Sequence, residues 1–231
     1  MKKTVVIYKK QVKDTGKNIA LLIQFVMFPV MAAIMKNAVR IEGMPENFFV
    51  DMFAVMHVGM APITVAAAVI SEEKEKNTLR VLLFADVKPM EYLCGIGGFI
   101  FSACMAGSIC LGILGGYTGG KFAAFLLIMA AGIAASMLFG AAIGIRSRSQ
   151  IAAVSVSTPF MMVFAFLPMI AMFNETVEKA ANVVYSQHIQ LLMNSLEAGT
   201  AVEPKNVIML AANMIIAVSL FLWAYRKNGL T

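Results

Sequence analysis

The sequence has few charged residues and few side chains that bind metals. Only 14% of its 231 residues are charged, and it contains two histidines and three cysteines. A soluble domain of this length normally carries far more charge. His57 and His188 alone do not make a metal centre, and Cys94, Cys104 and Cys110 are expected to be buried hydrophobic residues because they lie in or beside one apolar run. We therefore expect neither a metal site nor a disulfide framework.

The sequence also lacks a recognisable catalytic or nucleotide-binding motif. No nucleophile is placed beside a base, so we expect no catalytic residue and disfavour an intramembrane enzyme. Gly115, Gly120 and Lys121 match the spacing of a phosphate-binding loop, but Phe122 follows where Ser or Thr would bind magnesium, and no strand precedes the match. We interpret it as chance. The chain is therefore expected to bind no cofactor itself.

Long apolar runs dominate what is present. Apolar residues make up 60% of the chain. They predict an all-α, polytopic membrane protein in which residues 1–231 form a single transmembrane domain. The first run follows a basic start and is interpreted as a retained anchor, not as a cleaved signal peptide. The six expected spans lie at about 19–35, 48–70, 93–116, 122–145, 151–173 and 207–225.

Basic residues gather at the ends of these runs, and this arrangement predicts the topology. If the N-terminus is cytoplasmic, 14 of the 19 lysines and arginines fall on the inner side. We therefore expect a multi-pass protein of the cell membrane with both termini in the cytoplasm. The same distribution argues against nucleic acid as a partner, because the charge does not follow one polar face.

Two segments outside the spans are expected to be helical, one before the first span and one between the fifth and sixth. Residues 1–18 carry six lysines, with Val5, Tyr8 and Val12 on one stripe, and are expected to lie against membrane lipids; a simple charged tail is the alternative. Residues 174–206 are too polar to cross the membrane. They are expected to form one or two short helices on the outer face, with Gly199 as a helix stop.

The segment 71–91 is densely charged and lies between two spans. Glu72 and Lys76 have the spacing of a helical ion pair. Asn77 and Thr78 are suitable N-cap residues for a second short helix. The apolar face of that helix would consist of Leu79, Leu82, Leu83 and Val87. The segment is either a solvated loop or a docking helix for a soluble partner.

Polar and polarizable residues within the spans are candidates for a substrate pathway. Asp51 and His57 are ionisable groups in or near the second span, where such groups are costly. The alternatives are that Asp51 reaches water at the outer boundary and that His57 is neutral and bonded to a neighbouring helix. Met161 and Phe164 belong to a cluster in the fifth span that either lines a cavity or fills space against lipid.

Small residues recur every four positions in the third and fourth spans, which are expected to form a hairpin. Such ridges allow close packing of helices, and packing within one subunit is favoured over a ligand groove. The ridges are Ser108, Gly112 and Gly116 in one span and Gly132, Ser136, Gly140 and Gly144 in the other.

The arrangement resembles the permease subunits of type-2 ABC exporters. The most specific part is the inner loop, which in that family has charged residues, Gly-Thr-Leu-Glu, an apolar stretch, a proline and a glutamate. Here Asn77 replaces the glycine and can adopt the same left-handed conformation, whereas Arg80 replaces the acid. The matching residues are Glu73 to Arg80, Val81 to Leu83, Pro89 and Glu91.

The resemblance implies that residues 71–92 form a coupling helix seated on a separate ATP-binding subunit, which carries ATP and Mg. It also implies two ATP-binding subunits and a second permease subunit, the same or homologous, with substrate between the two permeases near the first, second and fifth spans. Export of a peptide antibiotic or ion for self-protection, or a non-transporting scaffold or sensor, are the alternatives. The implied coupling residues are Glu73, Glu75, Thr78, Leu79, Arg80, Leu82 and Leu83, and the candidate pathway residues are Gln24, Asp51, His57, Met161 and Phe164.

Overall fold

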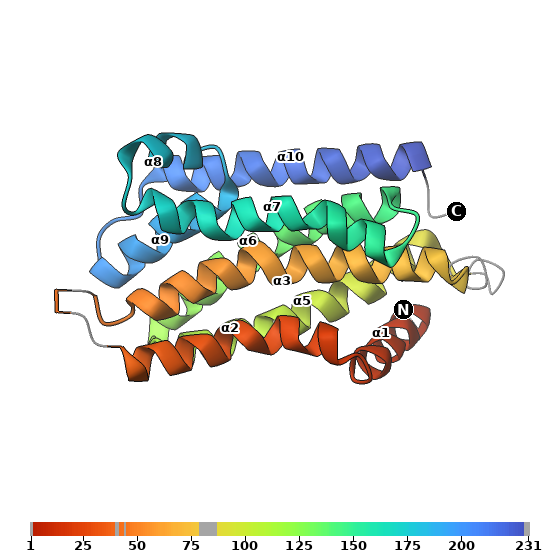
Figure 1. The fold of residues 1–231 in the computed structure, drawn as a ribbon, viewed down its shortest axis with the longest axis horizontal. Helices are drawn as coiled ribbons and strands as arrows, with labels where there is room; N and C mark the ends of the chain where they lie inside the picture. Colours follow the sequence, from red (N-terminus) through yellow and green to blue (C-terminus); the bar gives the residue numbers. More distant parts are fainter. Residues whose placement is uncertain (1, 40–41, 44, 79–86, 229–231) are drawn as a thin grey trace.

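The computed structural model describes residues 2–39, 42–43, 45–78 and 87–228. In this part of the chain the secondary structure is helical, without strands, and the long helices form one bundle (Figure 1). The all-α fold expected from the sequence is confirmed. The helices are α1 (Lys2–Thr15), α2 (Ile19–Ala38), α3 (Phe48–Glu75), α5 (Pro89–Leu114), α6 (Gly119–Arg146), α7 (Gln150–Ala171), α8 (Glu175–Ala181), α9 (Tyr185–Ala198) and α10 (Pro204–Asn228).

Six of the described helices are long and apolar enough to cross a membrane, namely α2, α3, α5, α6, α7 and α10. Their positions agree with the expected runs, and only two ends differ by more than three residues. Helix α3 continues through the charged residues to Glu75, because no proline or glycine lies between Ser71 and Asn77. Helix α5 already begins at Pro89, a residue suited to the first helical turn. The expected loop of residues 71–92 is therefore shortened at both ends.

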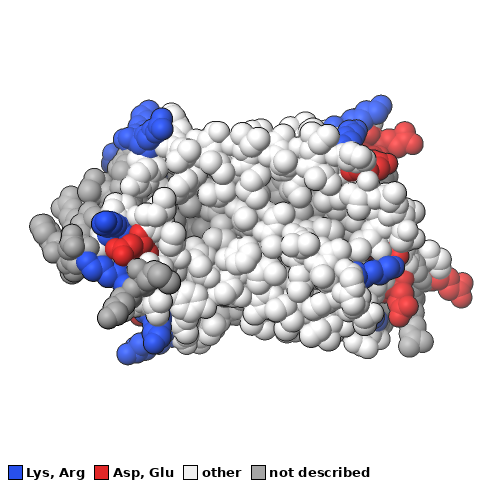
Figure 2. All heavy atoms as spheres, turned by 180° about the vertical axis from the view of Figure 1, so that it is seen from behind, with Lys and Arg blue, Asp and Glu red and all other residues white. Residues whose placement is uncertain are grey.

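Helix α3 occupies the centre of the bundle. Its most apolar window is 94% buried, compared with 22% for α2. The sequence explains this position, because α3 is apolar on all sides over most of its length. The other spans keep exposed apolar faces, and a belt without Lys, Arg, Asp or Glu separates two charged ends in Figure 2. These features identify a multi-pass membrane protein.

Glycines allow α6 to approach α3 closely. A Cβ added at Gly140 would lie 2.3 Å from the carbonyl oxygen of Ile63, and one at Gly144 would lie 2.8 Å from that of Ala67. The interpretation of this ridge as packing within one subunit is confirmed. Gly116, in contrast, belongs to the turn between α5 and α6, where its φ of +68° favours glycine.

A hydrogen-bond chain supports α3 where Pro62 interrupts it. A proline at this position removes the bond that would satisfy the carbonyl of Val58. The Ser136 hydroxyl of α6 donates to this carbonyl, and the Ser136 and Tyr185 hydroxyls lie 2.5 Å apart. Because Ser136 gives its proton to Val58, Tyr185 of α9 donates to Ser136. Helices α9, α6 and α3 are thus linked at the proline.

Different segments of the chain lie at the two ends of the bundle. Helix α1, the last turn of α3 and the last turn of α10 lie together at one end, which we call the basic end (Figure 1). The other end, which we call the α9 end, contains residues 42–43 and 45–47, the turn between α5 and α6, and helices α8 and α9. At this end Gly199 terminates α9 with a φ of +66°, as expected.

Helix α1 packs on α5 through Ile7, next to Gly95, which has no side chain to keep Ile7 away. Val5 and Val12 are exposed, so the expected contact of this stripe with lipid stays a prediction. The expectation that all three cysteines are buried is wrong. Of the three cysteines, only Cys104 is buried, because the other two lie on exposed faces of α5.

Candidate coupling site at the basic end

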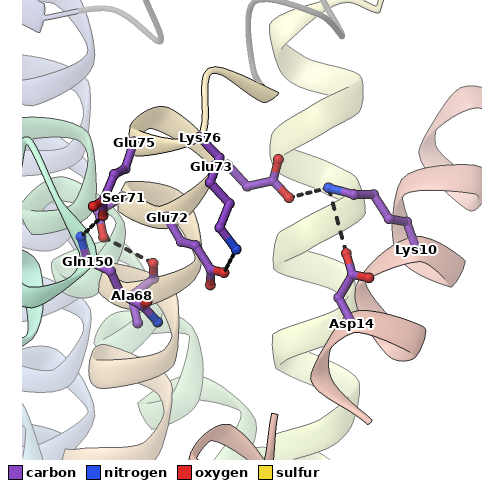
Figure 3. A network of polar contacts seen from close by, with 9 residues as sticks. All are labelled: Lys10, Asp14, Ala68, Ser71, Glu72, Glu73, Glu75, Lys76 and Gln150. Atoms are coloured by element: carbon purple, nitrogen blue, oxygen red, sulfur yellow. Dashed lines mark hydrogen bonds and ion pairs between the residues drawn. The ribbon is translucent and has the colours of Figure 1, made fainter. Parts of the chain in front are cut away.

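The last turn of α3 brings a run of charged residues to the base of the bundle. In Figure 3, Glu73 and Glu75 point away from α3 toward neighbouring helices. The backbone is held by Ser71, whose hydroxyl donates to the carbonyl oxygens of Ala67 at 2.7 Å and Ala68 at 3.0 Å. The site thus consists of a regular helix end with contacts on several sides.

Glu73 connects α3 to α1. Its carboxylate accepts a hydrogen bond from the Lys10 ammonium, which also lies 3.8 Å from the Asp14 carboxylate (Figure 3). Glu73 is only 8% exposed. A buried carboxylate requires such a partner, because removal from water is costly for an unpaired charge. The amphipathic N-terminal helix is therefore fixed to the central helix.

Glu75 and Lys74 connect α3 to the adjoining ends of α7 and α6. The Glu75 carboxylate accepts from the backbone N–H of Gln150, the first residue of α7, at 2.8 Å (Figure 3). The Lys74 ammonium donates to the carbonyl of Ile145, near the last residue of α6. An anion at a helix N-terminus and a cation at a C-terminus are both favourable. The base of α3 thus satisfies backbone groups of two further helices.

The predicted ion pair between Glu72 and Lys76 is confirmed, with the two charged groups 2.5 Å apart. The hydrogen bond to Glu72 raises the pKa of Lys76. Directly after this pair, Asn77 adopts a φ of +54°. This confirms that Asn77 takes the left-handed conformation for which the related loops use glycine.

A polar cavity of about 560 Å³ lies between α1 and the end of α3. Its walls include Lys10, Asp14 and Glu73, and Thr78 lines it where the chain leaves the helix. The expected coupling residues Glu73, Glu75 and Thr78 are therefore all placed at the base of the bundle. The remaining expected residues, Leu79, Arg80, Leu82 and Leu83, lie outside the described residues.

Two of the candidate pathway residues, Asp51 and His57, belong to α3 and bond different parts of the chain. Asp51 lies at the α9 end and accepts a hydrogen bond from the Tyr117 hydroxyl at 2.8 Å, while His57 bonds the Cys104 carbonyl of α5 at 3.0 Å. Asp51 is 2% exposed, so the expectation that it simply reaches water is wrong. The contact of His57 agrees with the alternative of a histidine bonded to a neighbouring helix.

The other pathway candidates are on α2 and α7. The Met161 sulfur accepts a hydrogen bond from the Thr64 hydroxyl at 3.2 Å, and Phe164 packs against Tyr185 with ring centroids 4.9 Å apart. Gln24 is half-buried on α2. Among the described residues that line the pocket containing Asp51, none is one of the other four candidates. One copy of the chain therefore does not gather the five residues in that pocket.

Sequence reasoning missed several partners at the base of α3. Lys10 was one of six N-terminal lysines with no feature to distinguish it, and Lys74 and Gln150 act through or on backbone groups. Periodic patterns in the sequence do not predict such contacts. The sequence predicts only that some helix ends lie close together, because the connections between the spans are short.

The family comparison agrees with the architecture. Residues 6–224 match the model of the family described as ABC-2 family transporter protein. A search of curated proteins found no match. The match covers five spans completely, most of the sixth and the charged segment at the base of α3, so it supports the resemblance to type-2 ABC permeases over nearly the whole chain. The chain belongs to the ABC-2 family of transporter membrane proteins.

Proposed function

We propose that this chain is the permease subunit of an ATP-driven exporter and that residues 71–92 dock on a separate ATP-binding subunit. The observation that carries the proposal is the base of α3, where consecutive charged residues bind α1, α6 and α7. A force applied to the loop beyond Asn77 acts on all of these helices together. This is the property required of a coupling element.

The proposed mechanism begins with ATP and Mg on the partner. ATP binding draws two ATP-binding subunits together, and each moves the loop of the permease on which it is seated. Glu73 and Glu75 pass this movement to α1 and α7, and the spans rock to open the outer side. The chain supplies no catalytic group to this cycle.

The proposed assembly contains a second permease copy, the same or homologous, with both termini of each permease in the cytoplasm. The concentration of lysine and arginine at the basic end supports this orientation. The substrate would pass between the two copies, near α2, α3 and α7. Gln24, Asp51, His57, Met161 and Phe164 remain candidates for this pathway.

Docking is tested by changing Leu79→Asp together with Leu83→Asp. Two carboxylates in an apolar docking face carry a large desolvation cost. We expect at least a tenfold loss of the ATP-binding subunit that copurifies with the tagged chain in mild detergent, at equal membrane insertion. The ratio of the two proteins is measured by quantitative mass spectrometry.

The matched control is Val183→Asp together with Val202→Asp. Both valines are exposed and lie at the α9 end, so this pair should leave copurification unchanged. Equal retention of a stoichiometric ATPase by wild type and the Leu79/Leu83 variant would contradict docking through this loop. Absence of any ATPase from the wild-type complex, with other membrane complexes intact, would instead favour the scaffold or sensor.

A further inference from the structure

Asp51 has an unsatisfied oxygen in a buried position. The residue lies in the first turn of α3 and is 2% exposed. Its Oδ1 accepts a hydrogen bond from the Tyr117 hydroxyl at 2.8 Å. Its Oδ2 has no hydrogen-bond partner in the part of the chain that the structure describes. Buried polar atoms are normally satisfied, so the free oxygen points to a missing partner.

This residue lines a pocket at the α9 end. The pocket has a volume of about 390 Å³ and lies between the start of α3, the end of α7 and one side of α9. Asp51 and Gln190 are its buried residues, whereas Glu46 and Asn194 are exposed at its mouth. Asp51, whose Oδ2 has no described partner, therefore borders a space that opens at the surface of the bundle.

The described residues that line the pocket carry charges of one sign. Asp51, Glu46 and Glu197 contribute carboxylates, and the described lining includes no lysine or arginine. Two lysines contact the rim from outside this lining. Lys121 donates to the Glu197 carbonyl at 3.4 Å, and Lys36 donates to the Asn47 side chain at 3.4 Å and to the Leu114 carbonyl at 2.7 Å. The Glu197 carboxylate accepts from the Asn47 backbone at 3.3 Å. The site is complementary to a cation.

The remaining walls indicate an organic cation and not a metal ion. Phe48 offers an aromatic ring, which is held edge-on to Phe49 at 5.3 Å, and Met172 offers a polarizable side chain. Both favour a ligand with an apolar body, and an aromatic face also attracts ammonium groups. Within the described residues, no group of three His, Cys, Asp or Glu side chains is placed to hold a metal ion. The volume lies in the range of small-molecule sites.

We propose that this pocket binds a small organic cation whose ammonium group donates a hydrogen bond to Oδ2 of Asp51. The apolar body of the cation packs against Phe48 and Met172, and Glu197 adds favourable charge at the side. Binding does not require the proposed coupling to an ATPase. The full-length chain alone therefore tests this site, and a failure of docking at the basic end leaves the result interpretable.

The test uses the full-length chain in lipid nanodiscs and radiolabelled 2-phenylethylamine as the probe, measured by equilibrium dialysis. We expect saturable binding that excess unlabelled amine displaces and that the neutral analogue 2-phenylethanol does not. Asp51→Asn keeps an acceptor for Tyr117 but removes the charge, and should weaken binding about 30-fold or more. Glu203→Gln, an exposed acid outside the pocket, should leave the affinity unchanged.

A second variant keeps Asp51 and fills the space. Ala198 is exposed and lines the pocket, so Ala198→Phe should reduce binding without changing the buried carboxylate. The proposal is overturned if the wild type shows no saturable binding, if 2-phenylethanol competes as well as the amine, or if Asp51→Asn binds with unchanged affinity. Displacement of the amine by potassium at equal concentration would also overturn it, because the site would then prefer an inorganic ion.

Discussion

The ion pair between Lys10 and Glu73 joins residues that are 63 positions apart in the chain. The Lys10 side chain is 37% exposed and that of Glu73 is 11% exposed. Exposed ion pairs stabilise proteins by about 0–1 kcal/mol, whereas breaking a buried pair costs about 3–5 kcal/mol. This pair lies between the two cases, and its loss leaves an unpaired carboxylate near the core.

Replacing Lys10→Ala is therefore expected to destabilise the chain by roughly 2 kcal/mol. Glu73→Ala should have a smaller effect, since it leaves only the more exposed lysine. Thermal denaturation in detergent measures both. Lys13→Ala, on an exposed position of the same helix, is the control and should behave as wild type. A Lys10→Glu/Glu73→Lys double variant less stable than either single reversal would contradict a direct pair.

Individual contacts were predictable only where they are local. The Glu72–Lys76 pair follows from helical spacing, and the left-handed Asn77 from its match to a glycine position. The contacts of Lys10, and the bond from Tyr117 to Asp51, depend on how distant helices are placed. Hydropathy and spacing carry no information about such placement.

At the scale of helices, α6 and α3 form the tightest contact in which glycine is required. The Cβ of an alanine at Gly140 would meet the Ile63 backbone, which cannot rotate away as a side chain does. The backbones must separate, and other contacts between the two helices are then lost. Packing at this crossing therefore depends on the absence of one methyl group.

Gly140→Ala is expected to destabilise the bundle by about 1–3 kcal/mol, the usual cost of overpacking. Thermal denaturation followed by circular dichroism measures the change. Gly120→Ala provides a control in the same helix, because an added Cβ meets nothing within 4 Å there. This variant should be neutral or slightly more stable, since alanine favours helix. Equal loss of stability in both would mean that close packing at Gly140 is not responsible.

The sequence predicts the spans but not all of their faces. Long apolar runs located all six membrane helices, because the bilayer sets their minimum length. The sequence did not predict that Ile7, and not Val5 or Val12, would face the bundle. The face of α1 that packs depends on Gly95, which belongs to a distant helix.

The whole molecule has two charged ends separated by an apolar belt (Figure 2). A belt of this kind places both ends in water on opposite sides of the membrane. The excess of lysine and arginine at the basic end supports the proposal that this end faces the cytoplasm. Orientation is a property of the whole chain, because no single charge determines it.

Single cysteines test this orientation. In a background with Cys94, Cys104 and Cys110 changed to alanine, Val183→Cys at the α9 end should react with a membrane-impermeant maleimide in intact cells. Lys13→Cys at the basic end should react only after the membrane is permeabilised. Both positions are exposed, so accessibility within the fold is matched. Labelling in the reverse order would contradict cytoplasmic termini.

Helix α3 carries Asp51 in its first turn and Glu73 in its last, and it is 28 residues long. At 1.5 Å per residue it extends roughly 42 Å, so one continuous element reaches both the pocket at the α9 end and the base. If nucleotide binding alters the affinity of that pocket, thermodynamic reciprocity requires an occupied pocket to alter the affinity for nucleotide by the same factor. A ligand bound in the pocket at the α9 end would thereby change nucleotide binding by a partner at the base of α3, without any additional sensor.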